Sequence, residues 1–189
     1  MKNTRQFSVT FLGTCSLGLT LLVVPALGQG LGIERGPYLN FGAGLNFMSA
    51  EFHADTGMRF SAAGGYNFNK WTGLELETGF LYNRNVGSKV HASGESLAQV
   101  PLMANFVLRY ENEAKVTPYV GFGLGADLMF GGSRSYGAVA YQPMAGVRYE
   151  INDKMSVGIG YKYLGYALTA MFGFVEGNHG VVAEFNLKF

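Results

Sequence analysis

The sequence has very little cysteine, proline and charge, and beyond its N-terminus it lacks any long apolar run. Its 189 residues include 1 Cys, 5 Pro and 14% charged residues, against 28 Gly and 48% hydrophobic residues. A lone cysteine excludes an intramolecular disulfide. After residue 28 no stretch approaches the roughly 18 uncharged apolar residues of a membrane-spanning helix. The apolar residues are instead spread in short pieces, which favours strands.

The first 28 residues differ from the rest. Lys2 and Arg5 precede a largely apolar segment over residues 7–24, and small residues follow at Ala26 and Gly28. This order predicts a signal peptide over residues 1–28, cleaved after Gly28, with a retained membrane anchor as the alternative. Residues 29–35 are then a short periplasmic segment, and residues 36–189 form the folded domain. Cys15 lies in the apolar segment and is expected to leave with it.

The balance of charge excludes one class of partner. Removing Lys2 and Arg5 from the 14 basic residues leaves 12, against 13 acidic ones. A chain so nearly neutral lacks the basic surface that binds nucleic acid. We therefore expect no nucleic-acid partner.

Apolar and polar residues alternate along most of the remaining chain. In the last ten residues Phe185, Leu187 and Phe189 lie on one face, and Glu184 and Lys188 lie on the other. A period of two is typical of a β-strand. Eight such strands are predicted, over residues 39–47, 58–68, 74–82, 100–110, 120–128, 139–149, 157–163 and 180–189.

The predicted connections are alternately long and short. Those at 67–70, 111–115 and 152–154 are short, whereas those at 49–56, 84–95, 130–137 and 167–178 are longer. Short turns at one end and long loops at the other are typical of outer-membrane barrels. The fold class predicted is all-β: an eight-stranded antiparallel up-and-down transmembrane β-barrel, after a cleaved signal peptide.

The distribution of charge decides which face points inward. A soluble barrel of the lipocalin type would bury its apolar face, whereas a membrane barrel turns it towards lipid. The apolar face carries no charge in any predicted strand, as lipid requires. The other face carries nearly balanced charges, which we expect to pair inside the barrel: Arg59, Glu75, Glu77, Arg109, Asp127, Arg148, Lys162, Glu184 and Lys188.

Three prolines fall within the predicted strands, at Pro101, Pro118 and Pro143. Proline cannot donate a hydrogen bond to the neighbouring strand. Positions near the barrel ends suit Pro101 and Pro118. Pro143 lies deeper, and we expect a β-bulge there.

From about residue 36 onward the chain resembles the outer-membrane protein β-barrel domain family, the OmpA/OmpX-like small barrels. The resemblance is carried by Val100-Pro101-Leu102, Pro118-Tyr119-Val120-Gly121, Gly146-Val147-Arg148-Tyr149 and the terminal Phe185-Asn186-Leu187-Lys188-Phe189. It implies an integral outer-membrane location. It also implies that Phe185, Leu187 and Phe189 form the assembly signal read by the barrel-assembly machinery.

The function expected is non-catalytic: a structural or surface-interaction role through long extracellular loops. No cofactor or metal is expected. Phe172 and Phe174 are candidate loop contacts to an extracellular protein, and outer-membrane lipid and lipopolysaccharide are further expected partners. A narrow or gated channel is the first alternative, because inward-facing glycines could leave space for water. A lipid A-modifying enzyme is the second, and His91-Ala92-Ser93 with Glu95 is its sole candidate site.

Overall fold

A computed structural model describes the chain over residues 36–48, 52–53, 55–88, 91–110, 115–131, 134–166 and 177–189. Its strands are β1 (Gly36–Met48), β2 (Phe52–His53), β3 (Gly57–Asn67), β4 (Thr72–Ser88), β5 (His91–Arg109), β6 (Val116–Gly131), β7 (Arg134–Asn152), β8 (Met155–Tyr166) and β9 (Gly177–Lys188). Among these residues, no helix is long and apolar enough to cross a membrane.

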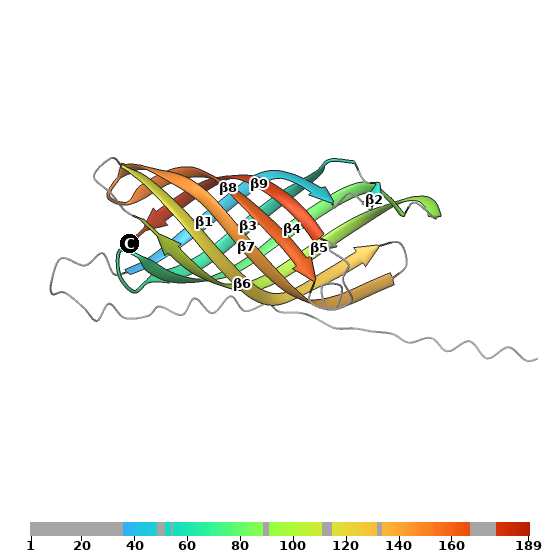
Figure 1. Cartoon of the computed structure of the whole chain (residues 1–189), viewed down its shortest axis with the longest axis horizontal. Coiled ribbons are helices and arrows are strands. Elements are labelled where there is room, and N and C mark those ends of the chain that lie inside the picture. Colours follow the sequence, from blue (N-terminus) through green and yellow to red (C-terminus); the bar gives the residue numbers. More distant parts are fainter. Residues whose placement is uncertain are drawn as a thin grey trace, which may run out of the picture.

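Eight long strands close into an antiparallel barrel (Figure 1). Strands that follow one another in the chain are paired, and β1 pairs with β9 to complete the circle. The short β2 adds two residue pairs to the far end of β4. This closed up-and-down arrangement confirms the predicted fold. We call its two ends the turn end, where the C-terminus lies, and the loop end.

The side chains alternate between the two surfaces of the wall. Large apolar side chains point outward, and Leu76, Leu102 and Ile159 are each more than 60% exposed. Charged and amide side chains point inward, and Arg59 and Gln142 are fully buried. Polar inside and apolar outside is the arrangement of a membrane barrel and the reverse of a soluble one.

Asparagine side chains close two of the turns at the turn end. Asn69 Oδ1 accepts the backbone N–H groups of Trp71 (2.7 Å) and Thr72 (2.8 Å). Asn152 Oδ1 likewise accepts those of Lys154 and Met155, both at 2.9 Å. Asparagine favours such turns because its side chain replaces a backbone acceptor. These turns fix the register of the strands that they join.

Two of the predicted long loops are instead largely strand. β4 continues to Ser88 and β5 begins at His91, so most of 84–95 is a hairpin that extends past the rest of the loop end (Figure 1). β6 and β7 similarly take up most of 130–137. The boundaries were wrong because strands that leave the membrane no longer need one apolar face. Residues 1–35 and 167–176, which include Phe172 and Phe174, lie outside the described residues.

The three prolines are accommodated in two ways. At Pro101 the ladder to β4 is interrupted between Thr78↔Leu102 and Leu81↔Gln99 without a change of register, as at Pro143. Pro118 accepts a hydrogen bond from the N–H of Tyr110 at the turn end. Around Pro143 the ladder to β8 is interrupted between Tyr141↔Gly165 and Met144↔Lys162, yet the register is the same on both sides. The β-bulge predicted at Pro143 is therefore wrong. Proline removes pairing there without adding a residue to the strand.

Candidate functional site: the charged interior of the barrel

Five strands contribute charged side chains to the middle of the interior. Arg59 comes from β3, Glu75 and Glu77 from β4, Arg148 from β7, Lys162 from β8 and Glu184 from β9. Each stands between outward-facing neighbours, so the alternation of the strand turns it inward. All six are at most 5% exposed.

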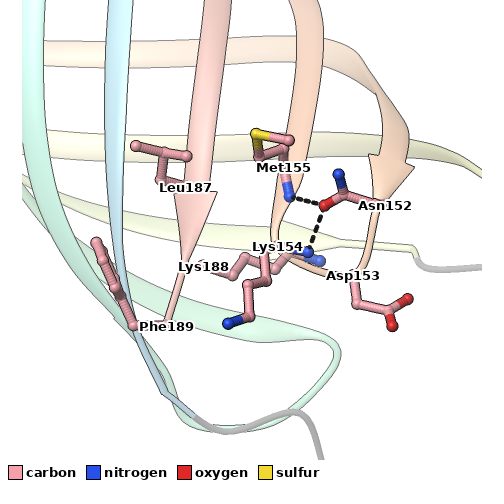
Figure 2. Close-up of a pocket in the computed structure, with 7 residues that line it drawn as sticks. All are labelled: Asn152, Asp153, Lys154, Met155, Leu187, Lys188 and Phe189. Carbon is pink, nitrogen blue, oxygen red and sulfur yellow. Dashed lines mark hydrogen bonds between the residues drawn. The ribbon is translucent and has the colours of Figure 1, made fainter.

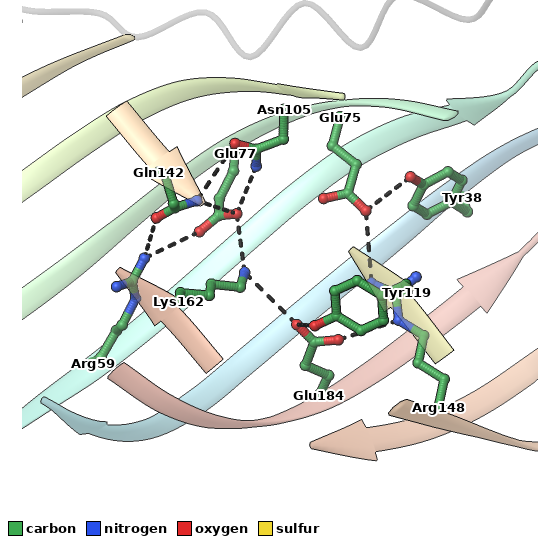
Figure 3. A network of polar contacts seen from close by, with 10 residues as sticks. All are labelled: Tyr38, Arg59, Glu75, Glu77, Asn105, Tyr119, Gln142, Arg148, Lys162 and Glu184. Carbon is green, nitrogen blue, oxygen red and sulfur yellow. Dashed lines mark hydrogen bonds and ion pairs between the residues drawn. The ribbon is translucent and has the colours of Figure 1, made fainter. Parts of the chain in front are cut away.

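These six residues form one chain of ion pairs with strictly alternating sign (Figure 3). Glu77 pairs with Arg59 at 3.7 Å and with Lys162 at 3.0 Å. Lys162 also lies 3.7 Å from Glu184, which pairs with Arg148 at 3.2 Å. Arg148 ends the series on Glu75 at 3.7 Å. Three positive and three negative groups neutralise one another, as buried charges require.

Neutral side chains supply further hydrogen bonds to the carboxylates. Glu77 accepts from Asn105 (2.8 Å) and Gln142 (3.2 Å). The hydroxyls of Tyr38 and Tyr119 donate to Glu75 (2.8 Å) and Glu184 (2.9 Å), respectively. Both tyrosines sit at inward positions of their strands, so the alternation could have identified them. Sequence reasoning missed them because it listed only formal charges.

The remaining predicted interior charges lie apart from this chain. Asp127 accepts hydrogen bonds from Gln99 and Tyr166, both at 3.1 Å, towards the loop end. Arg109 donates to Asn67 near the turn end, and its guanidinium lies 5.5 Å from the Tyr38 ring centroid. Lys188 pairs with Glu150 at 3.3 Å on the turn-end rim, where both side chains are partly exposed.

Amide and apolar side chains fill the interior beside the charges and towards the loop end. Hydrogen bonds run from Asn46 to Asn178 (3.0 Å), from Asn178 to Gln99 (2.9 Å) and from Gln99 to Asp127. An apolar cluster packs within the same half of the barrel, consisting of Leu81, Met103, Ala140 and Leu164. Side chains therefore occupy the interior from the ion pairs up to the hydrogen bond between Asn46 and Asn178.

The inward-facing glycines are closely packed as well. A Cβ atom added at any of them would come closer than 3.0 Å to another atom: Gly42, Gly44, Gly121, Gly123, Gly125, Gly158 and Gly160. At Gly121 the obstacle is the Met144 side chain, and at Gly123 it is that of Asn105. These glycines make room for neighbouring side chains and backbone.

A separate hollow of about 540 Å³ lies on the turn-end rim (Figure 2). The turn between β7 and β8 forms one side, and Leu187, Lys188 and Phe189 form the other. Phe185 and Phe189 are 37% and 72% exposed. The three residues predicted as an assembly signal therefore lie on the outward face of β9 and just past its end.

The structure does not describe the side chains of the candidate catalytic residues. His91, Ser93 and Glu95 belong to β5, but their side chains lie outside the part of the structure that is described. Within that part, no group of three or more His, Cys, Asp or Glu side chains could hold a metal ion.

Comparisons with known proteins agree with this geometry. The outer membrane protein beta-barrel domain family matches residues 15–189. Among solved structures, Neisserial surface protein A is similar with a TM-score of 0.65 at 15% identity, covering 82% of this chain and 97% of that one. OprG from Pseudomonas aeruginosa has a TM-score of 0.58 at 14% identity, covering 82% and 97%.

The attachment invasion locus protein Ail of Yersinia pestis, solved with the heparin analogue sucrose octasulfate, is a further match. Its TM-score is 0.52 at 14% identity, covering 83% of this chain and 100% of that one. At such identities these likenesses show the fold alone. No curated protein sequence matches the chain.

Proposed function

The chain belongs to the outer membrane protein beta-barrel domain family and is an integral outer-membrane protein, and on that premise we propose a closed, non-catalytic barrel. Its role is structural, or an interaction made by the segments that extend beyond the membrane. The turn end then faces the periplasm and the loop end faces the outside, as in barrels of this kind.

The observation that carries the proposal is the continuous series of ion pairs from Arg59 to Glu75. An eight-stranded barrel is only just wide enough for side chains to fill it. Here buried charges meet across the interior from strands on opposite sides of the barrel. Even a single Cβ atom added at an inward-facing glycine would collide with its neighbours. A continuous water path would have to separate these pairs.

Conductance in planar bilayers tests whether the barrel is closed. The refolded protein should give no steady current steps. The double variant Arg59→Ala/Lys162→Ala removes two side chains from the centre and should introduce brief openings. Steady steps from the unaltered protein would instead establish the channel function.

The non-catalytic part of the proposal needs its own test. Mass analysis of lipid A from cells with and without the protein should show the same species. A change in lipid A that disappears in His91→Ala, with the barrel still assembled, would establish a lipid-modifying enzyme.

The interaction role is proposed to involve Phe172 and Phe174, which the described residues do not include. Their replacement by Ser should abolish binding to host cells or matrix proteins while leaving a heat-modifiable barrel. If folding is lost and the unaltered protein shows no binding, the two residues serve packing and the adhesive role fails.

Recognition by the barrel-assembly machinery is proposed to use Phe185, Leu187 and Phe189. Deleting Phe189 should lower the fraction of protein inserted in the outer membrane, whereas Lys188→Gln should not. Equal insertion of all forms would show that the C-terminal aromatic residue is dispensable.

A further inference from the structure

Tyrosine and histidine side chains gather on the outward face of β7, β8 and β9 towards the loop end. Tyr161 and His179 share a hydrogen bond of 2.6 Å between the phenol oxygen and Nδ1. The rings of Tyr163 and His179 have centroids 4.9 Å apart, and those of Tyr141 and Tyr163 are 6.0 Å apart. We call these four residues the Tyr–His cluster.

Glycines on the neighbouring strands fix the cluster against the barrel wall. A Cβ atom at Gly165 would collide with the Tyr141 ring, and one at Gly177 would lie 2.6 Å from the Tyr163 hydroxyl. The rings of Tyr141 and Tyr163 therefore each lie over a glycine, where a side chain is absent. Such packing stabilises glycine in strands. Tyr163 is only 9% exposed although it points outward. The cluster is a fixed surface rather than a set of independent side chains.

The height of the cluster places it in the outer part of the membrane, close to the boundary with the outside. Tyr163 follows Met155, at the turn end of β8, by eight positions. With a rise of about 3.4 Å per residue and a strand tilt near 40°, that separation is about 20 Å along the barrel axis. The apolar band of such barrels is about 25 Å tall. Measured from Met155, the cluster therefore lies in the outermost part of this band, next to the headgroups of the outer leaflet.

His179 offers a hydrogen-bond donor at this level. A phenol O–H is a stronger acid than the N–H of a neutral imidazole, so we assign Tyr161 as the donor to Nδ1. The proton of the neutral ring is then on Nε2, where it can be donated to another molecule. Among the strand residues whose side chains the structure describes, Arg84 is the one Lys or Arg on an outward face, so a ligand bound mainly through phosphates would find little charge here.

We propose that the Tyr–His cluster binds the sugar headgroup of lipopolysaccharide in the outer leaflet. Sugar C–H faces pack on aromatic rings, a sugar oxygen accepts from His179 Nε2–H, and a sugar hydroxyl donates to the phenol oxygen of Tyr161. Ordinary phospholipid headgroups offer no such ring. This inference rests on the membrane location of the barrel and does not depend on its being closed or non-catalytic, so the two proposals can fail separately.

The test compares two lipids and three proteins. Protein refolded in detergent with ¹⁵N-labelled histidine is titrated with lipopolysaccharide or with phosphatidylglycerol, and lipid retention is counted by native mass spectrometry. Lipopolysaccharide should shift the His179 nitrogen resonances, whereas phosphatidylglycerol should not. His179→Phe keeps the ring and loses the donor, so retention of lipopolysaccharide should fall at least five-fold. Tyr149→Phe, an exposed tyrosine nearer the turn end, should retain as much as the unaltered protein.

Several results would overturn the proposal. Equal shifts with both lipids would make the cluster a general membrane anchor, and equal retention by His179→Phe would remove the donor from the site. Nitrogen shifts that place the proton on Nδ1 would reverse the assigned hydrogen bond. If His179→Phe does not fold, the titration of the unaltered protein and the variant Tyr161→Phe, which should weaken retention, still decide the question.

Discussion

Inside the barrel, the position of a charged residue in the series of ion pairs decides which charges lose a partner when that residue is removed. Lys162 touches two carboxylates, so its loss would leave both Glu77 and Glu184 with one partner fewer. Arg59 stands at one end, and removing it together with Glu77 leaves four charges that still alternate and sum to zero. The end pair can therefore be removed without leaving an unpaired charge.

The first prediction concerns this end pair. Arg59→Met should lower the free energy of unfolding by about 3–5 kcal/mol, because Glu77 stays buried with less compensation. Adding Glu77→Gln to the same protein should recover a large part of that loss. Denaturant unfolding of both variants and of Glu77→Gln alone in lipid vesicles gives the coupling. Additive losses would mean that the interior is hydrated and the charges are independent.

The second prediction concerns the outward face. Leu124 lies near the middle of β6 and is 59% exposed, so Leu124→Arg should cost about 2–4 kcal/mol of stability at the bilayer midplane. Tyr110→Arg, at the turn-end boundary, should cost only about 0–1 kcal/mol. The same unfolding measurement applies, with Leu124→Ala separating loss of the side chain from gain of charge. Equal costs at the two positions would place Leu124 away from the midplane.

At the scale of the strands, the sequence is informative wherever the membrane constrains it. Lipid requires one uncharged face, so alternation identifies all eight strands of the barrel and the inward direction of Arg59 or Glu184. Past the membrane both faces can be polar, and the outer parts of β4 and β5 look like a loop. The partners of each charge also depend on the stagger between strands, which no pattern within a single strand contains.

The pairing around Pro143 likewise could not be read from the pattern of a single strand. The third prediction concerns this residue. The interrupted ladder to β8 keeps its register, so an N–H group at this position could complete the pairing. In Pro143→Ala we expect the new amide to exchange hydrogen as slowly as its neighbours in β7. Pro118→Ala, at the turn-end rim, should gain no comparable protection. A rapidly exchanging amide at position 143 would show that the strands are held apart there by something other than proline.

For the whole molecule, the inner parts of the strands close the barrel, and the outer parts of some of the same strands extend beyond the membrane. Pairing between β4 and β5 keeps one register from Thr72↔Leu108 to Asn83↔Leu97, with a gap opposite Pro101. Beyond it the register shifts on either side of Val86. The buried charges of β4, Glu75 and Glu77, both lie within the part that keeps one register. The outer hairpin therefore contributes nothing to the series of ion pairs.

The fourth prediction follows from this division. Replacing residues 85–95 by Asn-Gly, which favours a two-residue hairpin turn, should leave a barrel that shows heat-modifiable migration on gels. It should also remain non-conducting, because the ion pairs remain. The series of hydrogen bonds that leads from Asn46 through Asn178 and Gln99 to Asp127 also remains. Replacing 85–95 by a Gly/Ser segment of equal length controls for loop length. If both forms fail to assemble, the outer hairpin is needed to close the barrel. If only the short form conducts, the hairpin itself blocks the interior.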